Sequence, residues 1–219
     1  MSAPVEPTSY RTIARDATAE IEVKRSRFLA QITRVEDEAA AREVVAAARK
    51  QHWDARHHCS AFVLGADARL RRSSDDGEPA GTAGAPMLEV LLGRGLSDVV
   101  VVVTRWFGGV LLGTGGLVRA YADATAAAAD AAGSLHRELV REYAVRVEHA
   151  QAGRLEADLR ARGWQVLGAE YAAEVTLRVG TTPESDAALV PQLAALTAGA
   201  AKPEPVGERW VDRCDAPGA

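Results

Sequence analysis

A segment rich in glycine and acidic residues, 75–86, is the first part of the sequence whose residue types could do chemistry. It reads Asp75, Asp76, Gly77, Glu78, Pro79, Ala80, Gly81, Thr82, Ala83, Gly84, Ala85 and Pro86. Backbone N–H groups of such a loop, with the N-terminus of a following helix, can bind an anion such as phosphate. Its three carboxylates could also hold a magnesium ion against that phosphate. The alternative, which we favour for such a loop taken alone, is an exposed turn in which the acids cap helices.

A second glycine-rich segment follows at 108–116 and strengthens the anion-binding interpretation. It reads Gly108, Gly109, Val110, Leu111, Leu112, Gly113, Thr114, Gly115 and Gly116. Thr114 is the expected N-cap of the next helix, and Gly115 and Gly116 would let a phosphate or a partner's backbone approach closely. The segment has neither the Gly-Lys-Ser/Thr of a P-loop nor the Gly-x-Gly-x-x-Gly of a dinucleotide site.

Two arginines beside this segment could add positive charge. Arg105 is expected at the end of a strand and Arg119 one turn into the following helix, although each could equally form a surface salt bridge. Two glycine loops in one small domain predict a functional surface between Arg71 and Arg119. The predicted anion- or partner-binding residues are Arg71, Asp75, Asp76, Gly77, Glu78, Gly81, Thr82, Gly84, Arg105, Trp106, Phe107, Gly108, Gly109, Gly113, Thr114, Gly115, Gly116 and Arg119.

Two further clusters are secondary candidates. In the first, Arg56 precedes His57, His58 and Cys59, which could suggest a metal site or a Cys–His nucleophile pair. Neighbouring strand residues point to opposite faces and further ligands are lacking, so we favour His58 as a hydrogen-bonded structural residue or a donor to a partner. No metal site is predicted. In the second, the run 24–28 places Lys24, Arg25 and Arg27 beside Phe28 at a strand turn, where they could contact RNA phosphates or simply form a solvated hairpin end.

The elements that must position these residues follow from hydrophobic periodicity. After a mobile N-terminus over 1–17, two strands are expected between 19 and 35, meeting near 24–27, and then a helix over 36–51. Strands are expected at 58–64 and 69–74, and a helix from Pro86 to Gly93. The β-branched run 99–104 predicts a strand covered on both faces, and the helix 117–132 should end at Gly133.

The remainder of the chain, 135–219, has a different order of elements. Strands are expected at 139–147, twice within 164–179, and at 205–211, with helices at 152–162 and 183–197. This β-α-β-β-α-β order predicts a ferredoxin-like domain. The fold class is therefore α+β in two domains, 18–134 and 135–219, with the boundary near Gly133.

Composition limits the function. The chain has 219 residues, 47% of them hydrophobic, and a formal net charge of -4, which argues against broad, non-specific nucleic-acid binding. Residues 1–135 carry nearly equal numbers of basic and acidic side chains, which leaves room for a local basic patch. Only two cysteines, Cys59 and Cys214, occur, and no apolar run suits a signal peptide or a membrane span. A cytoplasmic protein without membrane or cofactor partners is expected.

Four segments together resemble the YigZ/IMPACT family: 24–28, 54–59, 74–84 and 104–121. The resemblance covers about 18–133, and the remainder resembles the second domain of bacterial members. It implies an N-terminal domain like domain IV of translation elongation factor G and a C-terminal domain like its domain V. A eukaryotic member modulates the kinase that controls translation initiation, through a ribosome-associated activator. Family members often carry Lys or Arg where this chain has Ala85. The predicted anion-binding surface of this chain therefore has one cation fewer.

Three functions are compatible with these features. The leading hypothesis is a non-enzymatic, translation-associated regulatory protein that engages ribosomal RNA, another nucleic acid or a ribosome-bound protein through the glycine loops. The second is a magnesium-dependent enzyme or binding protein for a phosphorylated small molecule or nucleotide, although no general base is paired with a nucleophile. The third is a protein–protein adaptor with Trp106 and Phe107 as anchors, provided that these aromatic residues are exposed.

Overall fold

The computed structural model describes residues 7–213, which form two compact units. The first unit ends at Arg137 and also takes in Arg213, and the second covers Glu138–Asp212. Cys214 and the first six residues of the predicted mobile N-terminus lie outside the described residues. No helix within 7–213 is both long enough and apolar enough to span a bilayer.

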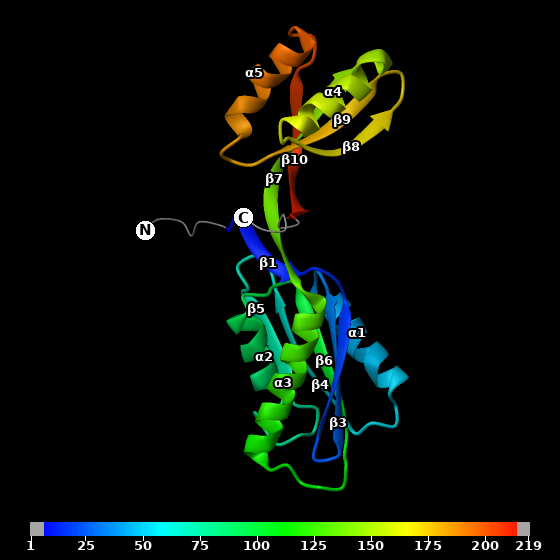
Figure 1. Ribbon diagram of the computed structural model, residues 1–219, viewed down its shortest axis with the longest axis vertical. Coiled ribbons are helices and arrows are strands. Elements are labelled where there is room, and N and C mark those ends of the chain that lie inside the picture. The colour runs from blue at the N-terminus through cyan, green and yellow to red at the C-terminus, as the bar shows by residue number, and fades with distance from the viewer. Residues whose placement is uncertain (1–6, 214–219) are drawn as a thin grey trace, which may run out of the picture. The chain divides into compact units, whose positions relative to one another are not determined.

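The first unit is built around one antiparallel sheet with the strand order β2-β3-β6-β4-β5 (Figure 1). Its strands are β2 (Ala17–Val23), β3 (Ser26–Arg34), β4 (His57–Leu64), β5 (Leu70–Ser74) and β6 (Val99–Trp106). Its helices are α1 (Glu38–Gln51), α2 (Gly84–Gly93) and α3 (Thr114–Ala132). The expected hairpin at 24–27, the helices and the strands are all present, with ends shifted by a few residues.

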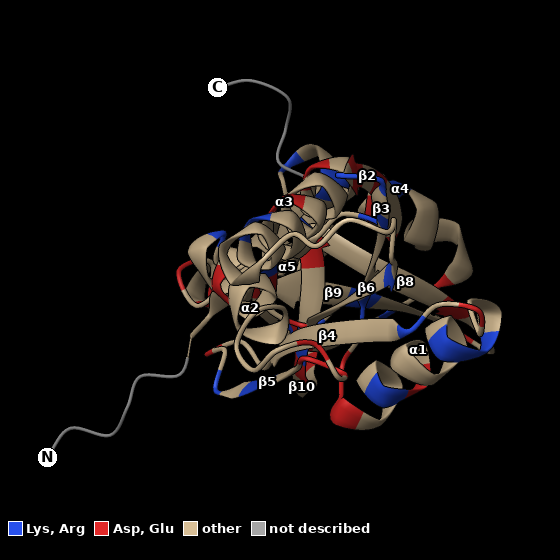
Figure 2. Cartoon of the chain, turned by 90° about the horizontal axis from the view of Figure 1, so that it is seen from below, with Lys and Arg blue, Asp and Glu red and all other residues tan. Residues whose placement is uncertain are grey.

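The central strand β6 is buried on both faces, as its β-branched run predicts. Val99, Val101 and Val103 pack in the core with α2 and α3, whereas Val100 and Val102 pack in a second core with α1. Helices therefore cover both sides of the sheet (Figure 1). Both basic and acidic residues lie along α1, with Glu38, Arg42 and Glu43 in its first half and Arg49 and Lys50 near its end (Figure 2).

The prediction of a mobile N-terminus over 1–17 is wrong for 9–13. These residues form β1 (Ser9–Ile13), in which Tyr10 is 8% exposed and Ile13 fully buried. β1 pairs with β7 (Ser134–Val147), whose first residues belong to the same unit. The partner strand begins more than 120 residues later in the sequence, so no local pattern indicates the pairing.

The second unit has the predicted β-α-β-β-α-β order. After most of β7 come α4 (His149–Ala161), β8 (Gln165–Tyr171), β9 (Val175–Thr181), α5 (Asp186–Thr197) and β10 (Pro203–Arg213). The strands are neighbours in the order β8, β9, β7 and β10, which is the arrangement of a ferredoxin-like domain. Leu159, Leu177 and Leu193 are fully buried in its core.

Candidate functional site

The β2–β3 hairpin supports the second glycine segment at one end of the first sheet (Figure 1). Its two turn residues, Lys24 and Arg25, have φ angles of 48° and 65°, a left-handed conformation that side chains disfavour. Gly108 packs directly on this turn, because a Cβ added there would lie 2.0 Å from the carbonyl carbon of Arg25. The Gly108 N–H also donates to Ser26 Oγ at 3.2 Å. Only glycine allows this contact between hairpin and loop.

Asp75 organises the first glycine segment from within. Its carboxylate accepts hydrogen bonds from the N–H groups of Gly81 (2.8 Å), Ala83 (3.0 Å) and Gly84 (2.8 Å). Burial alone would raise the pKa of Asp75, but these three donors outweigh it and hold the pKa below its ordinary value. The N-terminus of α2 is thus already occupied by a carboxylate of the same chain, which is the capping role that we favoured for this loop taken alone.

Asp76 fixes the first segment to β4 and α1. Its carboxylate accepts from Arg49 at 2.5 Å and from the His58 N–H at 2.7 Å. His58 is buried, and its Nε2 lies 3.1 Å from the His52 carbonyl oxygen. Desolvation lowers the pKa of His58 below its ordinary value, which favours the neutral ring. Of the two roles that we favoured for His58, a structural residue or a donor to a partner, these contacts fit the structural one.

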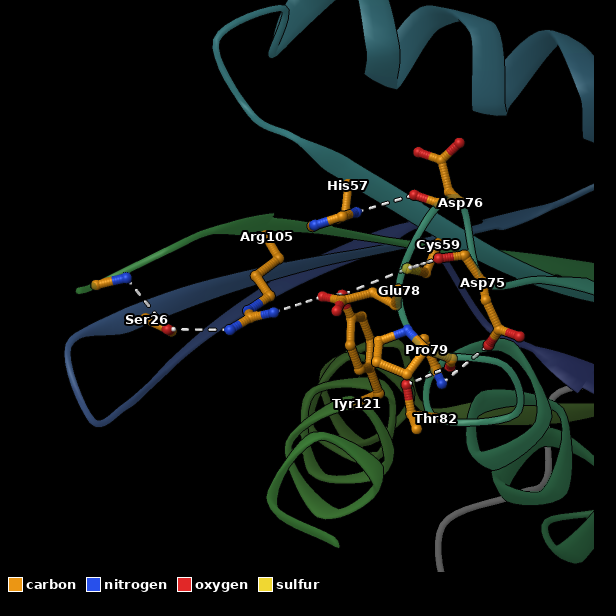
Figure 3. Close-up of polar contacts among 12 residues, drawn as sticks. Ser26, His57, Cys59, Asp75, Asp76, Glu78, Pro79, Thr82, Arg105 and Tyr121 are labelled. Carbon is orange, nitrogen blue, oxygen red and sulfur yellow. Dashed lines mark hydrogen bonds and ion pairs between the residues drawn. The ribbon is translucent and has the colours of Figure 1, made fainter. Parts of the chain in front are cut away.

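Glu78 belongs to a buried chain of polar contacts that crosses the core (Figure 3). Its Oε1 accepts from Arg105 at 2.6 Å and from the Tyr121 hydroxyl at 2.7 Å. Arg105 also donates to Ser26 Oγ at 3.4 Å, and the Cys59 thiol donates to the Tyr121 hydroxyl at 3.3 Å. The side chains of Arg105 and Glu78 are only 7% and 4% exposed. This series of polar contacts links the first glycine segment to the β2–β3 hairpin that supports the second glycine segment.

The surroundings of Cys59 exclude the proposed Cys–His nucleophile pair. The Cys59 sulfur lies 3.0 Å from the Asp75 carbonyl oxygen and 3.3 Å from the Tyr121 hydroxyl, so its one hydrogen can be donated to either, and neither partner is a histidine. Burial raises the pKa of Cys59 to about 12, and burial likewise raises that of Tyr121. A nucleophilic cysteine needs the thiolate, so Cys59 is a structural residue.

The second glycine segment ends at a helix N-terminus that the chain leaves open. The N-cap of α3 is Gly113, with a φ of 74°, and no side chain caps the helix. The prediction of Thr114 as N-cap is wrong, because the left-handed Gly113 turns the chain one residue earlier and Thr114 is the first helical residue. Within 7–213, the N–H groups of Thr114, Gly115 and Gly116 have no acceptor, and the first intrahelical bond of this end is from Leu117 to Gly113.

A cavity of about 400 Å³ opens beside this helix end. It is lined by Arg56, His57, Glu78, Pro79, Arg105, Phe107, Leu111, Leu112, Gly113, Thr114 and Leu117. Its rim is apolar and accessible, since Leu111 is 82% exposed and Phe107 48%. The cavity brings together residues of both glycine segments, the end of β6 and the start of β4.

Some of the remaining predicted residues are held by contacts within the chain, and others are exposed. Trp106 is partly buried: its indole N–H donates to Asp54 at 2.8 Å, and the Arg27 guanidinium lies 3.9 Å from its ring centre. Arg71 bonds the Ala68 carbonyl oxygen and does not line the cavity. Of the two proposed aromatic anchors, only Phe107 is substantially exposed. Arg25, Arg56 and Arg119 are exposed, and none of them forms an ion pair with a residue within 7–213.

The three acids of the first segment do not gather around a common point. Asp75 faces backbone N–H groups, Asp76 faces Arg49, and Glu78 faces Arg105 and Tyr121. Across residues 7–213, no three or more His, Cys, Asp or Glu side chains are grouped as metal ligands. These contacts give the magnesium hypothesis no support.

Sequence reasoning missed three contributors to this site. Ser26 joins Arg105 to Gly108, Tyr121 joins Glu78 to Cys59, and Leu111 is the most exposed residue of the apolar rim. Nothing local marked Leu111, because its neighbour Leu112 is also a leucine between the same glycines and is buried. Ser26 and Tyr121 gave no local signal, because their partners are distant in the sequence.

Comparison with known proteins finds two matching family models. The Impact N-terminal domain matches residues 24–129, and a domain of unknown function, DUF1949, matches residues 145–200. These ranges fall within the first and second units, respectively.

Two relatives and a solved structure each match most of the chain. This chain is 43% identical over 152 residues to the IMPACT family member YvyE of Bacillus subtilis. The matched region covers 69% of this chain and 70% of the relative. This chain is also 40% identical over 173 residues to the IMPACT family member YigZ of Escherichia coli. That match covers 78% of this chain and 85% of the relative. A crystal structure described as a hypothetical protein is similar with a TM-score of 0.62 and 37% identity, covering 91% of this chain and 98% of that one.

Proposed function

The chain belongs to the IMPACT family, and from this premise we propose that it is a non-enzymatic, translation-associated binding protein. It engages a component of the ribosome through the second glycine segment and the cavity beside it. The link to translation rests on the family, whereas the location rests on the geometry of α3. Neither glycine segment resembles a known catalytic motif, so binding is the activity that the geometry supports.

The open first turn of α3 carries the proposal. Three backbone N–H groups point out of the helix end without acceptors within the described chain, and the helix dipole adds partial positive charge there. A negatively charged group at such an end is stabilised by about 0.3–1 kcal/mol when exposed and up to about 2 kcal/mol when partly buried. An added Cβ at Gly115 would meet nothing within 4 Å, so a partner has room to approach.

The state of the acid–base groups supports binding over catalysis. Glu78 is held between Arg105 and Tyr121, and Cys59 stays a protonated thiol. His57 lines the cavity, but its Nδ1 lies 2.9 Å from the Asp76 carbonyl oxygen. A general acid or base must be within reach of a reacting group and able to exchange a proton, and these side chains are engaged in holding the fold.

Co-sedimentation of the full chain with bacterial ribosomes tests the proposal. At low salt the wild-type chain should pellet with ribosomes, and the pelleted fraction should fall as salt rises, because the contacts include an anion. Gly115→Asp should abolish pelleting by placing a carboxylate over the α3 N-terminus, whereas the uncharged, equally large Gly115→Asn should retain most of it. Failure of the wild-type chain to associate with ribosomes at low salt would overturn the proposal.

A further inference from the structure

We infer that the partner is a protein segment in which a carboxylate stands beside an apolar side chain. The carboxylate caps the first turn of α3, and the apolar side chain enters the cavity lined by Phe107, Leu111 and Leu117. The inference rests on the proposed function, whose site it shares, and specifies the chemistry of the partner. It is argued from the lining of the cavity, the charges around it and the exposed rim.

The lining of the cavity favours an apolar side chain over a nucleobase. The accessible lining is mostly apolar, and the apolar residues that contribute to it are Pro79, Phe107, Leu111, Leu112 and Leu117. The two charged groups at its base, Arg105 and Glu78, are bonded to each other and nearly inaccessible. A nucleobase has hydrogen-bonding atoms on its edges, and burying them without partners costs free energy. An aliphatic or aromatic side chain carries no such penalty.

The N-terminus of α2 is an example, within this protein, of a helix end that is capped by a carboxylate. At the start of α2, Asp75 accepts from the first helical residue, Gly84, and from the N-cap residue, Ala83, at 2.8 and 3.0 Å, and it also accepts from Gly81 in the preceding loop at 2.8 Å. The α3 N-terminus presents the N–H groups of its first three helical residues, Thr114, Gly115 and Gly116, and no capping side chain from within 7–213. A partner's aspartate or glutamate can therefore do for α3 what Asp75 does for α2.

Positive charge around the cavity complements an acidic segment. Arg56 lines the cavity and is exposed, and Lys24 and Arg25 form the hairpin turn against which Gly108 packs. Arg105 lines the cavity floor with its charge paired to Glu78, and its buried Nε has no hydrogen-bond partner within the described chain. The one acid in the lining, Glu78, is neutralised by Arg105 and does not repel a carboxylate.

The exposed rim is of the kind that binds protein. Phe107, Val110 and Leu111 are 48%, 39% and 82% exposed within one loop, an apolar group that solvent disfavours. Single-stranded RNA sites instead rely on exposed aromatic rings that stack on bases. The most exposed side chain here, Leu111, is aliphatic and cannot stack, so the rim favours a protein partner.

Paired selections with the purified full chain test this inference. A library of short random peptides displayed on phage and a pool of random single-stranded RNA are each selected on immobilised wild-type protein. Enriched peptides should share an Asp or Glu within two residues of Leu, Ile, Met or Phe. A synthetic enriched peptide should bind Gly115→Asp at least about tenfold more weakly than wild type, and Gly115→Asn nearly as well. Leu111→Ser should weaken binding severalfold, as should Asn in place of the acid in the peptide.

Four outcomes would overturn the inference. They are enriched peptides without an acid, peptides that bind Gly115→Asp as well as wild type, enrichment in neither pool, and enrichment of RNA alone with binding sensitive to Gly115→Asp. If one of these occurs while wild-type protein still pellets with ribosomes, the proposed function stands and only the chemistry of the partner is wrong. If acidic peptides bind but ribosomes do not, the proposed function is overturned instead.

Discussion

The two glycine segments look alike in the sequence and differ in what they leave unsatisfied. The first, 75–86, has its helix N-terminus filled by Asp75 and its other acids bonded to Arg49, His58, Arg105 and Tyr121. The second, 108–116, is tied down at Gly108 but opens onto an uncapped helix with exposed apolar side chains. Glycine content alone therefore does not identify a binding loop. What matters is whether the chain supplies its own acceptor.

The two segments consequently have complementary roles. The first is a support: through Glu78 it holds Arg105, which contacts Ser26 below Gly108. The second is the surface that this support presents. Changes in the first segment should lower stability, whereas suitable changes in the second should leave stability intact and affect binding.

The largest effect is expected for Glu78→Ala in the supporting segment. Removing this carboxylate leaves the buried Arg105 guanidinium without its ion-pair partner, which should destabilise the first unit by about 3–5 kcal/mol. Hydrogen exchange of the β6 amides under increasing denaturant measures this change in the free energy of unfolding. The double variant Glu78→Leu with Arg105→Met should recover most of the loss, because it removes both charges. A loss below about 1 kcal/mol for Glu78→Ala would show that the pair is not a support.

Asp75→Ala should have the next largest effect, about 1–2 kcal/mol, because it removes a helix cap. The effect should depend on pH. The folded state lowers the pKa of Asp75 below its ordinary 3.8, so its contribution is complete above that value and is lost as the pH falls through the folded pKa. Denaturant unfolding of wild type and variant at neutral and strongly acidic pH measures this. A stability difference that persists undiminished in acid would contradict the capping role.

Gly115→Asp in the second segment should change stability in the opposite direction. Replacing a helical glycine with aspartate gains about 0.3 kcal/mol of helix propensity, and a negative charge in the first turn adds about 0.3–1 kcal/mol. Gly115→Asn should show only part of this gain, since it lacks the charge. Thermal unfolding of the three proteins measures the difference. Destabilisation by Gly115→Asp would mean that the α3 N-terminus is already occupied, and the contrast between the segments would disappear.

The last prediction concerns Cys59, for which we expect no modification by a thiol reagent in the folded protein. In a Cys214→Ser variant, the remaining thiol should resist iodoacetamide in the folded protein at a pH near 9.0, the ordinary thiol pKa, because burial raises the pKa of Cys59 to about 12. Mass spectrometry should find it modified only after denaturation. Rapid modification of the folded protein would show that the interior beneath the first segment is open.

Local patterns were sufficient to predict most of the fold. The β-branched run at β6 predicted a strand buried on both faces, and Gly133 marked the end of α3. The ferredoxin-like order of the second unit followed from periodicity in the same way. Burial periodicity and helix-ending glycines act over a few residues, so the sequence displays them directly.

The contacts that distinguish the two glycine segments could not be predicted in this way. Whether Asp75 reaches the α2 N-terminus depends on how the loop folds back over six to nine residues. The pairing of Glu78 with Arg105 spans 27 residues, and that of Gly108 with Ser26 spans 82. Which helix end remains open is thus a property of the tertiary structure. The sequence could indicate both loops as candidates but could not choose between them.

Hydrogen exchange of the two helix ends, measured in the full chain with and without bacterial ribosomes, tests the central claim most directly. In the free protein, the amides of Gly81, Ala83 and Gly84 should be protected by Asp75, and those of Thr114, Gly115 and Gly116 should exchange rapidly. Ribosomes should slow exchange at 114–116 and leave the first set unchanged. Protection of 114–116 already in the free protein, or ribosome-induced protection confined to 81–84, would contradict the assignment of the second segment as the binding surface.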